Sequence, residues 1–273
     1  MSFDSSKVFT KQNLDLVFRD LSKEYKRLGG RKIPVDIVLI GGAAIIEGYG
    51  FREMTTDIDA LLPDMSIMQE AINRVGDLHG FPNGWMNADF MKTASYSHKL
   101  YQYSVPYKTF NQVLNVRMVT GEYLVAMKLR SGRQYKNDLS DIIGIIAEHK
   151  KTGSPLSYQQ IEEAVIKLYG SWEAFPEESI HFIKQALALD DPTGAYKTIR
   201  DNEVRNGIGL ENFQEQYPGV LSEKNIGSVI TNFAEKKDGR QSLIKQLQEL
   251  RAQAEHQPKE SSTVIHKSEQ QER

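Results

Sequence analysis

Hydrophobic and polar positions in the first half of the chain alternate between helical and extended spacing. Apolar residues recur at three- and four-residue intervals over 14–28 and 67–78, and glycine follows each stretch, which predicts two amphipathic helices. Short apolar runs at 35–40 and 57–62 predict two buried strands. We expect these two strands to be neighbours in one sheet.

Further elements follow the second predicted helix. Strands are predicted at 99–103 and 110–119, with a hairpin around Pro106. Thr120 stands where it can cap the next helix, and Asn137 stands where it can cap the one after. These elements indicate an α+β fold, in which a mixed N-terminal sheet is flanked by helices.

The pattern changes at a Lys-, Gly- and Pro-containing linker around residues 150–155. We expect an N-terminal domain at 1–150, a helical domain at 151–257 and a polar, disordered tail at 258–273. The helices of the second half are predicted at 158–169, 177–189, 196–205, 222–236 and 243–254. The last of these has a narrow apolar stripe that could dock on the body or on a partner helix.

Composition excludes several classes of protein. The 273 residues include no cysteine, so disulfides and thiol chemistry are excluded, and the six histidines form no pair at metal-ligand spacing. No apolar run approaches the roughly 20 residues of a membrane span, and the N-terminus has no apolar signal region. We therefore expect a cytoplasmic protein that does not contact the membrane.

Candidate chemistry is concentrated in the second predicted strand. Asp57 and Asp59 flank Ile58, and alternation along a strand turns both carboxylates to the same side. Two adjacent carboxylates repel each other and are tolerated mainly when a divalent cation lies between them. Gly41 and Gly42 end the preceding strand, where their backbone can approach a phosphate closely. The pattern predicts a magnesium site that faces a nucleoside triphosphate.

These residues resemble the nucleotidyltransferase superfamily, the polymerase-beta-like fold, whose signature is a Gly-Gly or Gly-Ser turn followed by Asp-x-Asp. The form found here is similar to the bacterial AbiEii/MenT-type branch, which is associated with toxin–antitoxin and phage-defence systems. The likeness covers about residues 10–150 and rests on Gly41 to Ala44, on Arg52, Thr55, Asp57 and Asp59, and on a later helix with Lys128 that is followed by Arg133 and Asp138 to Asp141.

The resemblance implies a metal-dependent transfer of an NMP from an NTP, such as ATP, to an acceptor. Asp57 and Asp59 would hold two Mg²⁺ ions, for which Mn²⁺ could substitute, and Gly41 and Gly42 would donate backbone N–H groups to the phosphates. The branch implies RNA, and the tRNA 3′ end in particular, as acceptor, and it implies a cognate antitoxin or other partner protein.

Four more residues have both a functional and an ordinary interpretation. Arg52 and Thr55 are expected to bind the triphosphate, although Arg52 could instead pair with a surface glutamate. The resemblance assigns Lys128 to the phosphates and Asp138 to catalysis. Lys128 could instead extend its stem to solvent, and Asp138 would stabilise a helix N-terminus in any protein.

One departure from the family pattern concerns the third carboxylate that many of these enzymes place on a later strand. Asn115 stands at the expected position, and Asp89 is a candidate replacement. A site without that acid could be slow, could rely on Asp138 or the metal, or could be inactive. A catalytically degenerate module that binds nucleotide, RNA or a partner protein is therefore an alternative hypothesis.

The interval from Lys92 to Lys136 is rich in basic and aromatic residues and contains a single acid, Glu122. Such a mixture suits contacts with phosphates and bases, but a half-buried sheet has the same composition. If the interval forms a basic surface, it favours RNA over small cationic drugs as acceptor. Transfer to a small molecule or to a protein hydroxyl is the remaining enzymatic alternative.

Overall fold

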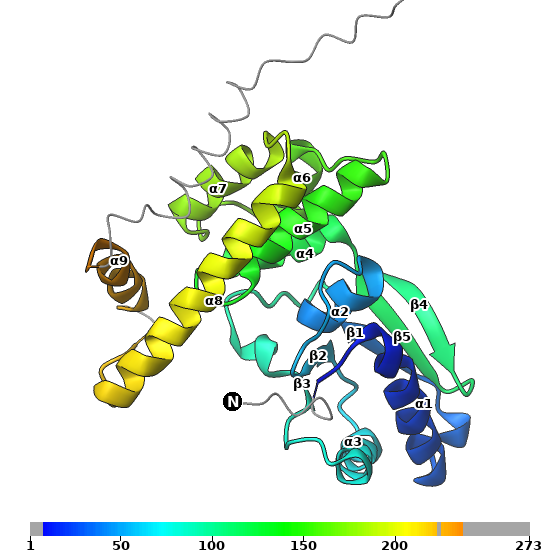
Figure 1. Cartoon of the computed structure of the whole chain (residues 1–273). Helices are drawn as coiled ribbons and strands as arrows, with labels where there is room; N and C mark the ends of the chain where they lie inside the picture. The colour runs from blue at the N-terminus through cyan, green and yellow to red at the C-terminus, as the bar shows by residue number, and fades with distance from the viewer. Residues whose placement is uncertain (1–7, 223–224, 237–273) are drawn as a thin grey trace, which may run out of the picture.

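The structure is a computed structural model, and it describes residues 8–222 and 225–236. It confirms the predicted α+β class, because a five-stranded mixed sheet is flanked by helices and followed by a helical C-terminal region (Figure 1). The predicted helix at 243–254 and the tail at 258–273 lie outside the described residues.

The sheet has the strand order β3-β2-β1-β5-β4. Central β1 pairs with β2 in antiparallel orientation, which confirms the prediction that these two strands are neighbours. On its other side, β1 is parallel to β5. At one side of the sheet β2 pairs with β3 in parallel orientation, and at the other side β5 pairs with β4 in antiparallel orientation. The strands are β1 (Val35–Leu39), β2 (Ile58–Leu61), β3 (Met86–Asn87), β4 (Ser104–Phe110) and β5 (Leu114–Val119).

Helices α1 (Lys11–Arg27) and α3 (Ser66–His79) pack against each other and appear below the sheet in Figure 1. Both confirm the predicted amphipathic helices. Each ends at a glycine as expected, since Gly29 and Gly80 have φ of 110° and 66°, a conformation that only glycine adopts without strain. The short helix α2 (Gly41–Gly48) begins directly after β1.

The hairpin differs from its prediction. Residues 99–103 form turns rather than a strand, and Pro106 lies inside β4. The reversal falls at Asn111 and Gln112, which both have positive φ. Pro106 is tolerated because β4 is an edge strand, where a missing N–H group leaves no ladder partner unsatisfied.

The C-terminal helices are α4 (Gly121–Ser131), α5 (Asp138–Lys151), α6 (Tyr158–Tyr169), α7 (Glu177–Leu187), α8 (Pro192–Gln216) and α9 (Ile226–Lys236). Helices α4 to α7 appear above the sheet in Figure 1, the long helix α8 crosses them diagonally, and α9 lies beside α8. The prediction for α8 was too short. Pro192 occupies its first turn and the Asp191 side chain accepts the N–H of Gly194, so the helix begins before residue 196.

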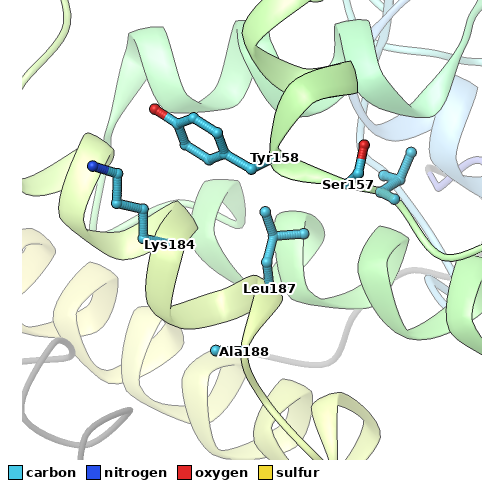
Figure 2. A pocket seen from close by; sticks show the side chains of 6 residues that line it. Ser157, Tyr158, Lys184, Leu187 and Ala188 are labelled. Carbon is cyan, nitrogen blue, oxygen red and sulfur yellow. The ribbon is translucent and has the colours of Figure 1, made fainter.

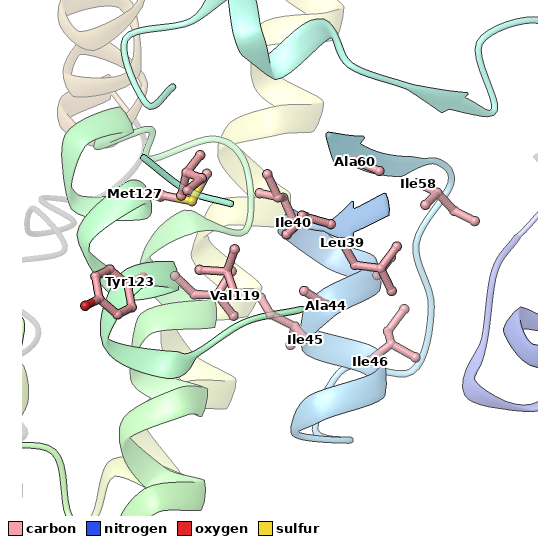
Figure 3. Packing of buried hydrophobic residues seen from close by; sticks show 14 of the residues in the cluster. Leu39, Ile40, Ala44, Ile45, Ile46, Ile58, Ala60, Val119, Tyr123 and Met127 are labelled. Atoms are coloured by element: carbon pink, nitrogen blue, oxygen red, sulfur yellow. The ribbon is translucent and has the colours of Figure 1, made fainter. Parts of the chain in front are cut away.

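One hydrophobic core runs through the sheet and the helices. Figure 3 shows apolar side chains of β1, α2 and β2 close to those of β5 and α4. The same cluster continues to Ile199 in α8, and α6 packs against α4 while α8 packs against α5. The C-terminal helices are thereby fixed relative to the sheet. The domain boundary at residue 150 stays a prediction. In the described part of the chain, no helix has the length and apolar character needed to cross a bilayer.

Candidate functional site

The predicted carboxylate pair lies at the end of β1 where the chain enters α2. Asp59 is in β2, and Asp57 lies just before it, at a bend. The backbone of Gly41 passes so close that a Cβ there would lie 3.0 Å from Asp59 Oδ2. Gly41 also has φ of 58°. The glycine therefore supplies both the close approach and the backbone conformation that the turn requires.

The two carboxylates act on each other electrostatically. Burial, together with the negative charge of Asp57, raises the pKa of Asp59 to about 6, and the charges of Lys128, Arg133 and Lys136 oppose this shift. Among the described residues, none donates a hydrogen bond to the Asp59 carboxylate. Asp57 accepts one from Thr55 Oγ1 at 3.5 Å. The pair thus has the like-charge repulsion that a bound cation would relieve.

Gly42 makes room for the two predicted phosphate-binding side chains. A Cβ at Gly42 would lie 2.5 Å from Thr55 Oγ1 and 2.9 Å from Arg52 Cζ. Thr55 is held in place because its backbone N–H and C=O both pair with Phe9, and Arg52 Nη2 lies 3.4 Å from its hydroxyl. Arg52 and Thr55 therefore lie against the first turn of α2, as their predicted role requires.

Gly42→Ala should consequently disturb the site without loosening α2. The added methyl group must displace Thr55 and Arg52, so we expect nucleotide affinity to fall by about tenfold, as for the loss of one or two hydrogen bonds to charged groups. Gly48→Ala is the matched control, because a Cβ there meets only Met118 Cε at 3.7 Å. Calorimetric titration with Mg²⁺·NTP measures the effect. Equal affinities of the two variants would contradict it.

Arg52 belongs to a chain of buried ion pairs. Its Nη1 lies 3.1 Å from Asp141 Oδ2, so its carboxylate partner is Asp141 and not the surface glutamates considered from the sequence. Lys128 Nζ lies 2.8 Å from Asp141 Oδ2 and 3.1 Å from Asp138 Oδ1. Arg133 Nε completes the chain at 2.8 Å from Asp138 Oδ2. Three cations therefore share two carboxylates.

The charges in this cluster support one another. Burial would lower the pKa of Lys128, but Asp141 and Asp138 outweigh it and raise that pKa. Burial would likewise raise the pKa of Asp138, but Lys128 and Arg133 outweigh it and lower that pKa to about 2. The cluster of Arg52, Lys128, Arg133, Asp138 and Asp141 contains three basic and two acidic side chains, so its formal net charge is one positive. The alternative in which Lys128 extends its stem to solvent is wrong, since Lys128 is buried.

A residue bonded to the helix that carries Asp138 and Asp141, and missed by sequence reasoning, is Glu203 in α8. Its carboxylate accepts the backbone N–H groups of Leu139 and Ser140, at 2.7 and 3.3 Å, in the first turn of α5. Asn137 and Thr120 occupy the predicted N-cap positions, but neither side chain forms the capping hydrogen bond. No local pattern could have identified Glu203, because more than 60 residues separate it from the helix that it caps.

Comparison with known proteins agrees with this geometry. Residues 17–148 match a family described as "Nucleotidyltransferase of unknown function (DUF6036)". This match supports the nucleotidyltransferase superfamily for the matched domain. The match includes the glycine turn, the carboxylate pair and the entire ion-pair cluster, but not Glu203. No curated protein and no solved structure matches the chain.

The position of a third carboxylate in the matched domain can be judged from the sheet register. Asn115 in β5 pairs with Asp36 in β1. Asp36 is four residues before Ile40 along the chain, and the backbone N–H of Ile40 donates to the backbone oxygen of Asp59. Asn115 is hydrogen-bonded to Asp36 and Thr109 and is too far along the sheet to face the pair. Asp89 is exposed and pairs with Lys92. Neither residue therefore supplies a third acid.

The donor set of the domain fits a divalent cation held by two carboxylates. Within the described ranges, no group of three or more His, Cys, Asp or Glu side chains is arranged to hold a metal ion. Mg²⁺ retains several waters and is commonly bound by one or two carboxylates plus substrate phosphates. The unbonded, partly buried Asp59 carboxylate beside Asp57 suits this mode of binding.

The basic interval of the domain does not form one open cationic surface. Lys108 pairs with Asp15, and Lys92 pairs with Asp89. Arg117 donates to Ser104, and Arg130 lies over the rings of Tyr169 and Phe175. Much of the positive charge is thus engaged within the protein.

A shallow pocket lies outside the domain, between α6 and α7 (Figure 2). Lys184 and Tyr158 lie at its edge, with Lys184 Nζ 5.6 Å from the ring centroid. Its lining includes no carboxylate. This pocket is therefore not the site at which a metal-bound triphosphate would react.

Proposed function

We propose that this protein transfers an NMP from an NTP to an acceptor hydroxyl in a metal-dependent reaction. One observation carries the proposal. The Asp57–Asp59 pair lies against the glycine turn of α2, and two cations of the ion-pair cluster, Lys128 and Arg133, lie close enough to oppose the rise in the pKa of Asp59. Carboxylates for cations and cations for phosphates thus converge at one edge of the sheet.

The chain's residues have distinct tasks in this reaction. Asp57 and Asp59 would hold Mg²⁺ or Mn²⁺, which when bound activates the hydroxyl and neutralises charge on the departing pyrophosphate. The N–H groups of Gly41 and Gly42 and the start of α2 attract the triphosphate. Arg52 and Thr55 would hold the phosphate oxygens, and the buried Lys128 would add positive charge near them. The acceptor hydroxyl then loses its proton to solvent, its oxygen bonds to the α-phosphorus, and the bond to pyrophosphate breaks.

RNA, and the tRNA 3′ end in particular, is the acceptor that we propose. Support comes from the likeness of the Gly41-Gly42, Asp57-x-Asp59 and Lys128 to Asp141 motifs to the AbiEii/MenT-type branch, and the same likeness supports a role as the toxin of a toxin–antitoxin or phage-defence pair. The dispersed basic interval adds no support, so the acceptor needs a direct experiment.

The experiment incubates the purified protein with each labelled NTP, Mg²⁺ and total RNA. Asp57→Ala combined with Asp59→Ala should reduce incorporation by at least about a hundredfold, since both protein ligands of the cation are lost. Circular dichroism should show that the variant stays folded. Equal incorporation by the wild type and the variant would exclude this site.

Two competing functions make different predictions in the same assay. Transfer to a small molecule should be insensitive to salt, whereas RNA modification should weaken steeply as ionic strength rises. A catalytically degenerate module should bind Mg²⁺·NTP without turnover on any RNA. Neither Asn115 nor the exposed Asp89 supplies a third carboxylate to the site, and this favours the degenerate module as the second candidate.

A further inference from the structure

Glu203 connects the long helix α8 to the cluster of ion pairs. The residue is 1% exposed, and each carboxylate oxygen accepts one backbone N–H group from α5. The first N–H groups of a helix have no partner within that helix. Since the Asn137 side chain makes no capping bond, Glu203 provides from a distance the cap that α5 lacks locally.

The turn that Glu203 caps carries both carboxylates of the cluster. Asp138 precedes the two capped amides, and Asp141 follows them directly. Asp141 holds Arg52 and Lys128, while Asp138 holds Lys128 and Arg133. A shift of this turn would therefore move all three cations relative to Gly41 and Asp59.

We propose that Glu203 is a positioning residue of the nucleotide site, which fixes the first turn of α5 and thereby the three cations that would receive the triphosphate. The inference rests on the proposed function and extends it, because α8 lies outside the family match at residues 17–148. The C-terminal helical region would then be an integral part of the active site.

The ionisation of Glu203 provides a readout of this role that a purely structural residue would not give. Burial raises its pKa to about 8, the hydrogen bonds from Ser140 and Leu139 oppose the shift, and the charges of Asp141 and Asp138 add to it. Tyr196, another residue of α8, interacts electrostatically with both Asp141 and Glu203. As pH rises through 8, Glu203 gains a negative charge and the net positive charge of the neighbouring cluster is cancelled. Attraction of the triphosphate should fall accordingly.

The test compares three variants of the full-length protein by calorimetric titration with each Mg²⁺·NTP. Glu203→Ala removes both acceptors and should weaken binding about tenfold at pH 7, the effect expected for loss of a good helix cap. Glu203→Gln keeps one acceptor and, like the neutral Glu203 side chain that predominates at pH 7, carries no charge, so it should weaken binding at most about threefold. Glu211→Gln, at an exposed position of the same helix, is the matched control and should bind like the wild type.

The pH profile gives the second arm of the test. Wild-type affinity should decrease between pH 7 and 9, while that of Glu203→Gln should stay constant because its side chain does not titrate. Hydrogen exchange at the amides of residues 139–141 should accelerate in Glu203→Ala and not in Glu211→Gln.

Each outcome is informative about one of the two proposals. Unchanged exchange in Glu203→Ala, or a wild-type pH profile in Glu203→Gln, would overturn the positioning role. If the wild type binds no NTP but exchange still accelerates in Glu203→Ala, the positioning of α5 is supported and the proposed nucleotidyl transfer fails.

Discussion

Asp59→Asn should make the metal-free protein more stable. The pKa of Asp59 is about 6 in the folded protein, compared with an ordinary value of 3.8, so the folded state holds the proton more tightly than the unfolded state. The ionised group therefore destabilises the fold, progressively from about pH 4 to pH 6 and fully above that range. The shift corresponds to about 2–3 kcal/mol at pH 8. Asparagine removes the charge and should recover most of it.

Urea unfolding at pH 8 in the presence of EDTA measures this gain. Asp64→Asn is the control, because Asp64 is an exposed aspartate shortly after the same strand and should change stability little. Added Mg²⁺ should stabilise the wild type and not Asp59→Asn, since a cation that binds only the folded state shifts the equilibrium toward it. An Asp59→Asn variant that is less stable than the wild type without metal would show that Asp59 is satisfied by the protein alone.

Such a gain on removing a side chain would mark Asp59 as a residue kept for chemistry. A group retained for stability forms favourable contacts, and its removal destabilises the protein. The Asp59 carboxylate instead combines partial burial, a like-charged neighbour and no hydrogen bond from the described residues. Lysine and arginine charges nearby reduce the cost without removing it.

The sequence predicted those parts of the site that are close together in the chain. Gly41, Gly42, Arg52, Thr55 and the aspartate pair fall within 19 consecutive residues, and the structure brings them together at one turn. Strand alternation and the need for glycine near a phosphate are local rules. They could therefore be applied without knowledge of the rest of the fold.

The remaining contacts could not be predicted, because they join residues far apart in sequence. Arg52 and Asp141 are 89 positions apart, and Glu203 caps a helix that begins 65 positions earlier. Many glutamates stand at similar positions on helices, and only the packing of α8 against α5 distinguishes this one. The hairpin was misplaced for a related reason, since a proline is excluded from a central strand and not from an edge strand.

Asp141→Ala should produce the largest loss of stability among the substitutions considered, about 3–5 kcal/mol. Asp141 is 1% exposed, and its removal leaves Arg52 without a carboxylate partner and Lys128 with only Asp138. Breaking a buried ion pair on one side costs this much because the remaining charge is desolvated and uncompensated. Glu148→Ala, which breaks an exposed pair with Lys151 on the same helix, is the control and should cost no more than about 1 kcal/mol.

A double-mutant cycle separates the ion pair from general loss of packing. Arg52→Ala combined with Asp141→Ala removes both charges, so the double variant should be more stable than the sum of the single effects by about 1–3 kcal/mol. Urea unfolding of the four proteins measures this coupling. Additive effects would mean that Arg52 and Asp141 do not interact in solution. In that case Arg52 is free to approach a triphosphate, and the cluster that links α8, α5 and the glycine turn is not the unit that organises the site.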